Sequence, residues 1–358
     1  DSCDFSLESY CADPAEEDAE LRRFSIERPG KYVFPMLDDI VKIRPELRLL
    51  LSPWSPPEYM KDNAKRTGGG KLRPEFRERW ARYMCRYALE YRKRGYDVFA
   101  MSVQNEPNAV QPWESCIYTP EEERDFLRDF LAPELRRQGL GDMVITIWDH
   151  NKERLFDRVD AICSDPGANA CAGAAGFHWY GGDHFDALRL VRRKYPDKLL
   201  MFTEGCIEYS KGSHEAQTEN AERYAWEILH GFNAGLNAFF DWNLLLDMSG
   251  GPNHKGNYCD APIMVDPERK SLKYNLSYSY IMHFSRYIRP GAVRIGTTCY
   301  DNDLGFCAAL NPDGSIVAVA LNTSAAGKKG FVRLRGELAE AFFPPHSIST
   351  LLIGGEEV

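Results

Sequence analysis

Short apolar runs alternate with longer amphipathic stretches from the start of the chain to about residue 290. Each run has the length of a buried strand and each intervening stretch can form a helix, which is the pattern of βαβ units in a parallel sheet. The six runs are residues 47–51, 98–103, 143–148, 174–178, 199–203 and 236–242. A closed barrel of this kind needs eight strands. The chain therefore predicts strands three to eight of a (β/α)8 TIM barrel, and we expect the first two strands to precede Asp1.

Helix signals lie between these runs. Residues 74–94 carry apolar side chains at helical spacing, among them Phe76 and Trp80. Thr119 precedes Pro120 and two glutamates, which is typical of an N-cap followed by the first turn of a helix.

The pattern changes after about residue 290, where we predict antiparallel strands. The turn Asn311-Pro312-Asp313-Gly314 separates two of them. The expected strands are residues 293–298, 305–310, 316–322, 330–335 and 347–353. The prediction is an N-terminally incomplete barrel domain over residues 1–290 and part of a β-sandwich domain over residues 291–358.

Composition disfavours several classes of protein. The 358-residue chain has a net charge of −9, whereas a nucleic-acid surface needs clustered Lys and Arg. No apolar run approaches the roughly 20 residues of a membrane helix. None of the ten cysteines forms a C-x-x-C pair, and several lie within apolar runs. We therefore expect no zinc or redox motif, and a reducing compartment, the cytoplasm.

Two of the strand-like runs lead directly to a glutamate. Glu106 follows the run at 98–103 and Glu204 follows the run at 199–203, roughly three barrel units apart at about 31 residues per unit. Barrels of this type carry their catalytic groups at the carboxyl ends of the strands. Two carboxyl groups there predict an acid and a nucleophile that act on one glycosidic bond. The alternative for each is a structural carboxylate that caps a helix N-terminus.

A wider set of motifs carries a resemblance to a known family. The segment Gln104-Asn105-Glu106-Pro107 resembles the acid/base motif of glycosidases whose catalytic residues end strands four and seven. The other motifs are Ser52-Pro53-Trp54, Phe177-His178-Trp179-Tyr180, Phe202-Thr203-Glu204-Gly205-Cys206, Asp241-Trp242-Asn243 and the loop over residues 250–263. In order and spacing, the whole set resembles glycoside hydrolase family 30, especially its glucosylceramidase-like branch.

The resemblance implies a role for each matching residue. Glu106 would be the general acid/base and Glu204 the nucleophile, with Asn105 hydrogen-bonded to the sugar 2-hydroxyl. Tyr180 would orient Glu204. The residues expected to line the sugar pocket or its entrance are Trp54, Trp179, Trp242 and Asn257. The family's first strand carries a Gly-rich motif with a sugar-binding aspartate that has no counterpart in this chain, which leaves the sugar preference open.

Two strand ends carry histidines that the roles above do not fully use. His178 is compatible with a metal ligand, although a hydrogen-bonding or pocket-lining role is favoured. Asp149 and His150 could contact substrate or pair with a neighbouring strand end. No H-E-x-x-H pattern is present, and we expect no metal and no cofactor.

The expected function is a retaining β-glycosidase that hydrolyses β-glucoside-type bonds through a covalent glycosyl-enzyme. Its partner would be a β-linked glycoside or oligosaccharide, with exo action favoured. The acid must be protonated while the nucleophile is ionised. We therefore expect burial and the charge of Glu204 to raise the pKa of Glu106, and we expect a bell-shaped pH–rate profile. The alternatives are a β-1,6-glucanase, a β-xylosidase, a β-fucosidase or a non-catalytic carbohydrate-binding barrel.

Overall fold

The computed structural model describes residues 2–354 and divides into two compact units. Unit 1 comprises Asp1–Thr203 and Asn253–Gly256, and unit 2 comprises Glu204–Pro252 and Asn257–Val358. The ends of the two predicted domains, residue 1 and residues 355–358, lie outside the described residues. The predicted boundary at residues 290 and 291 stays a prediction.

Unit 1 is built on parallel strands that follow one another in sequence order. β1 pairs in parallel with β2, β2 with β3, and β3 with β4. The strands are β1 (Arg48–Leu51), β2 (Asp97–Ser102), β3 (Val144–Asn151), β4 (Ala174–His178) and β5 (Leu199–Glu204). They match five of the six predicted runs to within three residues, and β4 is fully buried along its length.

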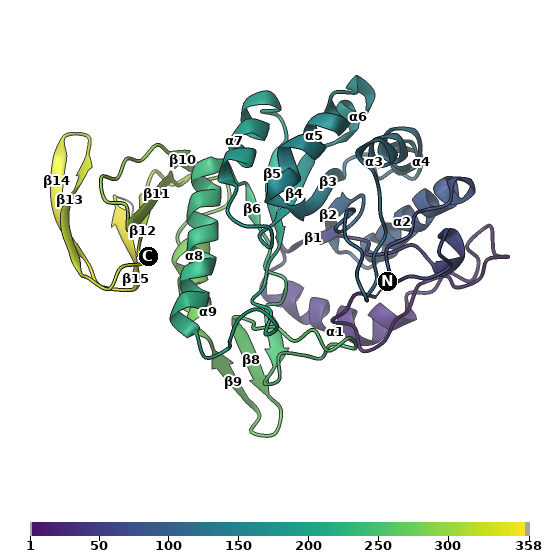
Figure 1. The fold of residues 1–358 in the computed structure, drawn as a ribbon, viewed down its shortest axis with the longest axis horizontal. Coiled ribbons are helices and arrows are strands. Elements are labelled where there is room, and N and C mark those ends of the chain that lie inside the picture. The colour runs from purple at the N-terminus through teal and green to yellow at the C-terminus, as the bar shows by residue number, and fades with distance from the viewer. Residues whose placement is uncertain (1, 355–358) are drawn as a thin grey trace. The chain divides into compact units, whose positions relative to one another are not determined.

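Helices cover the outer side of this sheet, as Figure 1 shows for α2, α3, α5 and α7. The predicted cap at Thr119 is confirmed: its backbone N–H donates to Glu122 (2.8 Å), and the Glu122 N–H donates to the Thr119 hydroxyl (3.2 Å). The helices of unit 1 are α1 (Glu27–Ile43), α2 (Arg77–Arg92), α3 (Pro120–Phe126), α4 (Ala132–Arg137), α5 (Leu155–Cys163), α6 (Pro166–Cys171) and α7 (Phe185–Lys194), with a π-helical turn at Leu127–Leu131. None of the described helices of the chain is both long and apolar enough to cross a membrane.

Unit 2 packs two helices, α8 (Gln217–Ala234) and α9 (Leu276–Ser285), against an antiparallel sheet. That sheet has the order β10–β11–β12–β15, and a separate hairpin joins β13 to β14. Its strands are β10 (Val293–Ile295), β11 (Leu304–Leu310), β12 (Ile316–Asn322), β13 (Lys328–Leu334), β14 (Glu337–Phe343) and β15 (Ser347–Ile353). The core contains Leu229 of α8, Phe284 of α9 and Val319 of β12.

The structure differs from the sequence prediction in three places in unit 2. The run at 236–242 forms only the two-residue strand β6 (Ala238–Phe239). The strand β14 was not predicted; it follows a turn in which Arg335 and Gly336 both have positive φ, the geometry of a tight hairpin. A small sheet was also not predicted, and it contains β7 (Leu245–Asp247), β8 (Ile263–Asp266) and β9 (Ser271–Tyr274).

A bulge near the end of β3 shapes the functional end of unit 1. Trp148 pairs with Gly176 and His150 with Phe177, so Asp149 is the extra residue. Trp148 and Asp149 have φ values of 69° and 50°, a left-handed conformation that is unfavourable for residues with a side chain.

Gly176 gives the bulge the space that it needs. A Cβ at this position would lie 2.9 Å from Cγ2 of Thr146 and 3.1 Å from Cα of Asp149. We expect Gly176→Ala to lower the free energy of unfolding by about 1–3 kcal/mol, because strand β3 must shift to relieve the overlap. Denaturant titration measures the change. Gly330→Ala is the matched control, since the position also lies in a strand and its added Cβ meets nothing within 4 Å. Equal stabilities of the two variants would contradict the prediction.

Candidate active site

The side chain of Glu106 lies just beyond the carboxyl end of β2, as the sequence predicts. Its backbone N–H donates to the carbonyl of Asp149 (2.9 Å), and its own carbonyl accepts from Ala109 (2.9 Å). The φ of Glu106 is 47°, so the backbone turns sharply here. These contacts fix the loop and hold the buried carboxylate at the end of the sheet.

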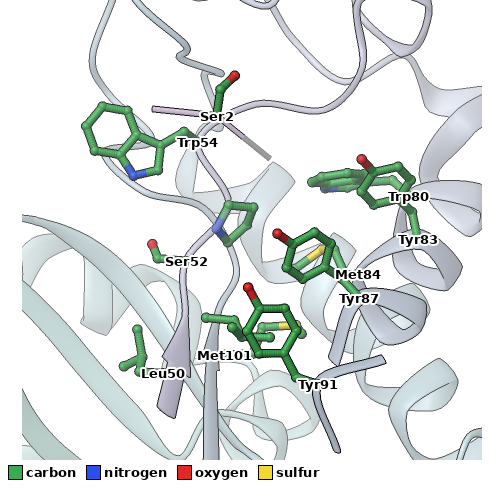
Figure 2. Close-up of a pocket in the computed structure, with 12 residues that line it drawn as sticks. Ser2, Leu50, Ser52, Trp54, Trp80, Tyr83, Met84, Tyr87, Tyr91 and Met101 are labelled. Carbon is green, nitrogen blue, oxygen red and sulfur yellow. The ribbon is translucent and has the colours of Figure 1, made fainter. Parts of the chain in front are cut away.

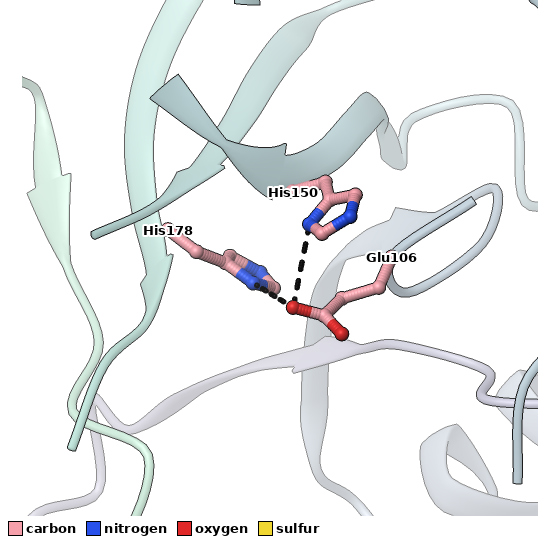
Figure 3. A group of neighbouring side chains, drawn as sticks. All are labelled: Glu106, His150 and His178. Atoms are coloured by element: carbon pink, nitrogen blue, oxygen red, sulfur yellow. Dashed lines mark hydrogen bonds and ion pairs between the residues drawn. The ribbon is translucent and has the colours of Figure 1, made fainter. Parts of the chain in front are cut away.

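Two imidazole rings point at one oxygen of this carboxylate, as Figure 3 shows. Nδ1 of His178 lies 3.2 Å from Oε1 of Glu106, and Nδ1 of His150 lies 3.3 Å from the same atom. His178 comes from the last position of β4 and His150 from the bulged end of β3. Three neighbouring strand ends therefore meet at Glu106.

His178 lies between two carboxylates and is completely buried. Its Nδ1 faces Glu106, and its Nε2 lies 3.2 Å from Oδ1 of Asp149. A neutral imidazole has a single N–H to donate. Either the ring is an imidazolium that donates to both carboxylates, or Glu106 carries a proton and donates it to Nδ1. In both states Glu106 and His178 share one proton.

Asp149 holds the His178 ring in place and is itself held by a hydrogen bond. The hydroxyl of Ser52, in the loop after β1, donates to its Oδ2 (2.7 Å). Burial alone would raise the pKa of Asp149, but the contact with His178, together with hydrogen bonds from neighbouring hydroxyl groups, outweighs burial and holds the pKa below its usual range. Asp149 therefore stays ionised and keeps the Nε2 proton of His178 directed toward itself.

The expected rise in the pKa of Glu106 is wrong. Burial does push this pKa upward, but the close contacts and charges of His150 and His178 outweigh it and hold the pKa well below its usual range. The shared proton therefore rests on the imidazole side of the cluster when Glu106 is ionised. Sequence reasoning placed Glu106 at the strand end but could not count the partners that neighbouring strands bring to it.

The loop after β1 brings two further predicted residues to the same end of unit 1. The Asn105 N–H donates to the carbonyl of Pro53 (2.8 Å), and the Gln104 amide donates to the carbonyl of Trp54 (2.8 Å). Asn105 and Trp54 are both buried. The backbone of residues 53–54 is therefore tied to the residues that precede Glu106.

A cavity of about 190 Å³ opens on the α2 side of β1 and β2. Its lining includes Tyr87 and Tyr91 of α2 together with Leu50 and Met101 of the strands, which Figure 2 shows as sticks. Trp54 reaches this cavity, but Glu106, His150 and His178 do not line it. The cavity and the carboxylate–histidine cluster are separate features of unit 1.

Trp179 and Tyr180 follow β4 directly. Trp179 is buried with its ring centroid 5.6 Å from that of Phe202 in β5, in an edge-to-face arrangement. Tyr180 is partly exposed, and its ring lies edge-on to His178 at 6.1 Å. Trp179 thus packs under the strand ends, while Tyr180 lies beside the cluster.

The remaining predicted residues belong to unit 2. Glu204 is the last residue of β5 and is buried. Trp242 is partly buried, and its N–H donates to the carbonyl of Gly205 (3.1 Å). Asn257 is partly buried in the loop that precedes Cys259, whose thiol lies 3.3 Å from that of Cys206. The roles predicted for these residues stay predictions.

Sequence reasoning gave Asp241 no role of its own, although it lies beside Trp242. Its Oδ1 accepts from the Tyr224 hydroxyl (2.9 Å), while its Oδ2 is buried without a hydrogen-bond partner among the described residues. Burial raises the pKa of Asp241 to about 8, more than the hydrogen bond from Tyr224 lowers it. The folded protein therefore holds this carboxyl protonated at neutral pH.

This shift predicts a pH dependence of stability. A carboxyl whose pKa is raised on folding disfavours the folded state progressively as pH rises from the unfolded pKa, near 4, to the folded pKa, near 8. We expect Asp241→Asn, which still accepts from Tyr224, to gain stability over the wild type by about 2–4 kcal/mol between pH 4 and pH 8. Denaturant titrations across this range measure the gap. The control is Asp313→Asn. Hydrogen bonds from Ser315 lower the pKa of that exposed carboxyl, so this variant should not gain stability over the wild type between pH 4 and pH 8. A gap for Asp241→Asn that does not change with pH would contradict the prediction.

Comparison with known proteins identifies the family. The family model described as the glycosyl hydrolase family 30 TIM-barrel domain matches residues 1–288, and the model of the family's β-sandwich domain matches residues 291–351. Lysosomal acid glucosylceramidase of Mus musculus is 30% identical over 341 residues, which are 90% of this chain and 66% of that protein. The chain thus spans just under two thirds of the length of this relative.

Two solved structures share the fold along almost the whole chain. The crystal structure of SrfJ from Salmonella typhimurium superposes with a TM-score of 0.96 at 40% identity, covering 99% of this chain and 80% of that one. The endo-β-1,6-glucanase BT3312 superposes with a TM-score of 0.87 at 28% identity, covering 97% and 79%. The predicted barrel and β-sandwich and the predicted family are therefore confirmed. The chain belongs to glycosyl hydrolase family 30.

Proposed function

We propose that the protein is a retaining β-glycosidase that cleaves β-glucoside-type bonds, with Glu106 as general acid/base and Glu204 as nucleophile. One observation carries the proposal: Oε1 of the buried Glu106 carboxyl lies 3.2 Å from Nδ1 of His178, and Nε2 of the same ring lies 3.2 Å from Oδ1 of Asp149. An acid/base must give a proton to a leaving oxygen and later take one from water, and a neighbouring imidazole can exchange that proton with it. Membership of the family supports the same assignment.

In the first step, the Glu204 carboxylate attacks the anomeric carbon and the glycosidic C–O bond breaks. The leaving oxygen takes the proton through Glu106, which is left ionised. In the second step, water attacks the anomeric carbon of the glycosyl-enzyme and gives its proton to Glu106, while the ester bond to Glu204 breaks. The sugar is released with its original anomeric configuration.

The two histidines, His150 and His178, stabilise the ionised form of Glu106. Because they hold its pKa low, the carboxyl stays ionised after the first step, which is the form that takes a proton from water in the second. The proton that the first step needs returns from the imidazole side, since His178 lies 3.2 Å from Oε1. We propose that Asn105 binds the sugar 2-hydroxyl, that Tyr180 orients Glu204, and that five further side chains line the sugar pocket. They are Trp54, His178, Trp179, Trp242 and Asn257.

The proposed substrate is a β-glucoside, attacked from its non-reducing end. Similarity to the mouse glucosylceramidase supports this choice. A second candidate is endo action on β-1,6-glucan, because the glucanase BT3312 shares the fold over 97% of this chain. No other partner is implied by the site.

The two roles are tested by chemical rescue in the full-length protein. We expect Glu204→Gly to lower kcat by about 10³-fold or more, because no covalent intermediate can form. Added azide should restore turnover of an activated aryl β-glucoside and give the glycosyl azide of inverted configuration. Glu106→Gly with azide should instead give the retained configuration, and NMR of the products separates the two.

The control for these variants is Glu215→Gly, which alters an exposed glutamate in a turn of unit 2. It should keep the activity of the wild type. Full activity of Glu204→Gly without added nucleophile would overturn the assignment. Sugar binding by the wild type without any turnover would favour the non-catalytic alternative.

A panel of substrates tests the specificity. We expect kcat/KM for an aryl β-glucoside to exceed that for the β-xyloside by about 10-fold or more, because the xyloside lacks the hydroxymethyl group that a glucose pocket contacts. The aryl β-fucoside and polymeric β-1,6-glucan complete the panel. Rapid release of oligosaccharides from the polymer with little action on aryl glucosides would favour the glucanase instead.

A further inference from the structure

We propose that Glu106, His150 and His178 form a binding site for a divalent transition-metal ion, with Zn²⁺ as the best fit. The inhibition that follows from this site rests on the proposed function; the binding itself does not. The ion would occupy the oxygen that the acid/base uses for proton transfer.

The donor atoms have the spacing of a metal site. Nδ1 of His150 and Nδ1 of His178 lie 3.3 Å and 3.2 Å from Oε1 of Glu106, and the ligand atoms of all three residues lie within 4.8 Å of one another. Zn–N and Zn–O bonds of about 2.0–2.1 Å in a tetrahedron separate neighbouring ligand atoms by roughly 3.3 Å. An ion can therefore enter with small shifts of the side chains.

The surroundings of His178 match those of a metal-binding histidine. Such a histidine directs its second ring nitrogen to a carboxylate, which fixes the ring and leaves the first nitrogen toward the metal. Here Nε2 of His178 faces Oδ1 of Asp149 (3.2 Å), and Asp149 is itself held by the Ser52 hydroxyl (2.7 Å). Nδ1 of His178 therefore faces Glu106, on the side where the ion would bind.

His150 provides an independent indication. Its Nδ1 is buried and makes no aligned hydrogen bond, although it lies close to Glu106. A buried nitrogen without such a bond is unfavourable. Coordination of a cation would satisfy it. The ring is positioned by Trp148, with centroids 5.0 Å apart.

The donor set selects the kind of ion. Two imidazole nitrogens and one carboxylate oxygen suit Zn²⁺, and also Cu²⁺, Co²⁺ and Ni²⁺. Mg²⁺ and Ca²⁺ require oxygen ligands and would bind poorly. Three protein ligands leave a fourth position for water, so the site would be open rather than structural.

Bound metal would block the proposed hydrolysis. A Glu106 oxygen that coordinates Zn²⁺ cannot deliver a proton to the leaving group at the same time. We expect micromolar to millimolar Zn²⁺ to inhibit the enzyme reversibly, with activity restored by a chelator, whereas Mg²⁺ at the same concentration has no effect.

Binding is measured without reference to activity. Isothermal titration calorimetry of the full-length protein with ZnCl2, in a buffer that does not bind metal, should show one bound Zn²⁺ per chain. Binding of this ion should be weakened when a residue of the cluster is changed. Titration with CoCl2 should give visible absorption bands of low-coordinate Co²⁺ without the near-ultraviolet charge-transfer band of a thiolate. That band would indicate the thiol pair Cys206 and Cys259 instead.

The variants are His150→Ala and His150→Gln, which remove one ligand, and Asp149→Asn, which alters the carboxylate behind His178. We expect each to weaken Zn²⁺ binding by about 10-fold or more. His184→Ala is the control, because it removes an exposed histidine of unit 1 whose Nε2 lies 3.1 Å from the Gly181 carbonyl oxygen. Its Zn²⁺ binding should match that of the wild type. Circular dichroism checks that each variant is folded.

The outcomes separate this proposal from the proposed function. No Zn²⁺ binding, a thiolate spectrum, or binding that His150→Ala and His150→Gln leave unchanged would overturn the metal site. Hydrolysis of β-glucosides with no metal binding would leave the glycosidase standing and the metal site refuted. Metal binding by a protein without hydrolytic activity would support the metal site and refute the glycosidase.

Discussion

The burial of one ionised carboxylate, that of Asp149, organises the functional end of unit 1. A carboxylate removed from water is unfavourable unless charged or hydrogen-bonding groups surround it. Asp149 obtains these groups from the loop after β1, through Ser52, and from the end of β4, through His178. The same contacts join three strand ends and leave the second nitrogen of His178 to face Glu106. The position of the Glu106 carboxylate is thus linked to the hydrogen bonds that the neighbouring Asp149 requires.

The backbone around this carboxylate is strained, and a second buried charge pair compensates for it. Left-handed conformations at Trp148 and Asp149 each disfavour the folded state by about 1–3 kcal/mol. Glu123 of α3 accepts from the Trp148 N–H (2.7 Å) and from Arg158 of α5 (2.8 Å), and both charged side chains are almost fully buried. The helices outside the sheet therefore hold the bulge in a conformation that β3 would not adopt by itself.

The sequence predicts local features well and long-range electrostatics poorly. Apolar runs located β1 to β5 because burial on both faces of a parallel strand leaves a continuous hydrophobic signal. The hairpin β13–β14 was predicted only in its first half, since β14 carries charged and exposed residues that give no such signal. Glu106 was found from its place after a strand, yet the direction of its pKa shift was wrong. That direction depends on His150 and His178, which lie 44 and 72 residues further along the chain, and on the register that brings them together.

The bulge in β3 also changes the direction in which the side chains that follow it point. In a regular strand, consecutive side chains point to opposite faces, so adjacent residues cannot serve one site. The extra residue resets this alternation, and Asp149 and His150 can then both act at the same end of the sheet. The placement of these two side chains thus depends on the number of residues in β3 as well as on which residues they are. Deletion of a single residue of β3 before Asp149 would change which face of the sheet these side chains occupy, while Asp149 and His150 would both remain in the sequence. Inspection of motifs alone would not detect such a change.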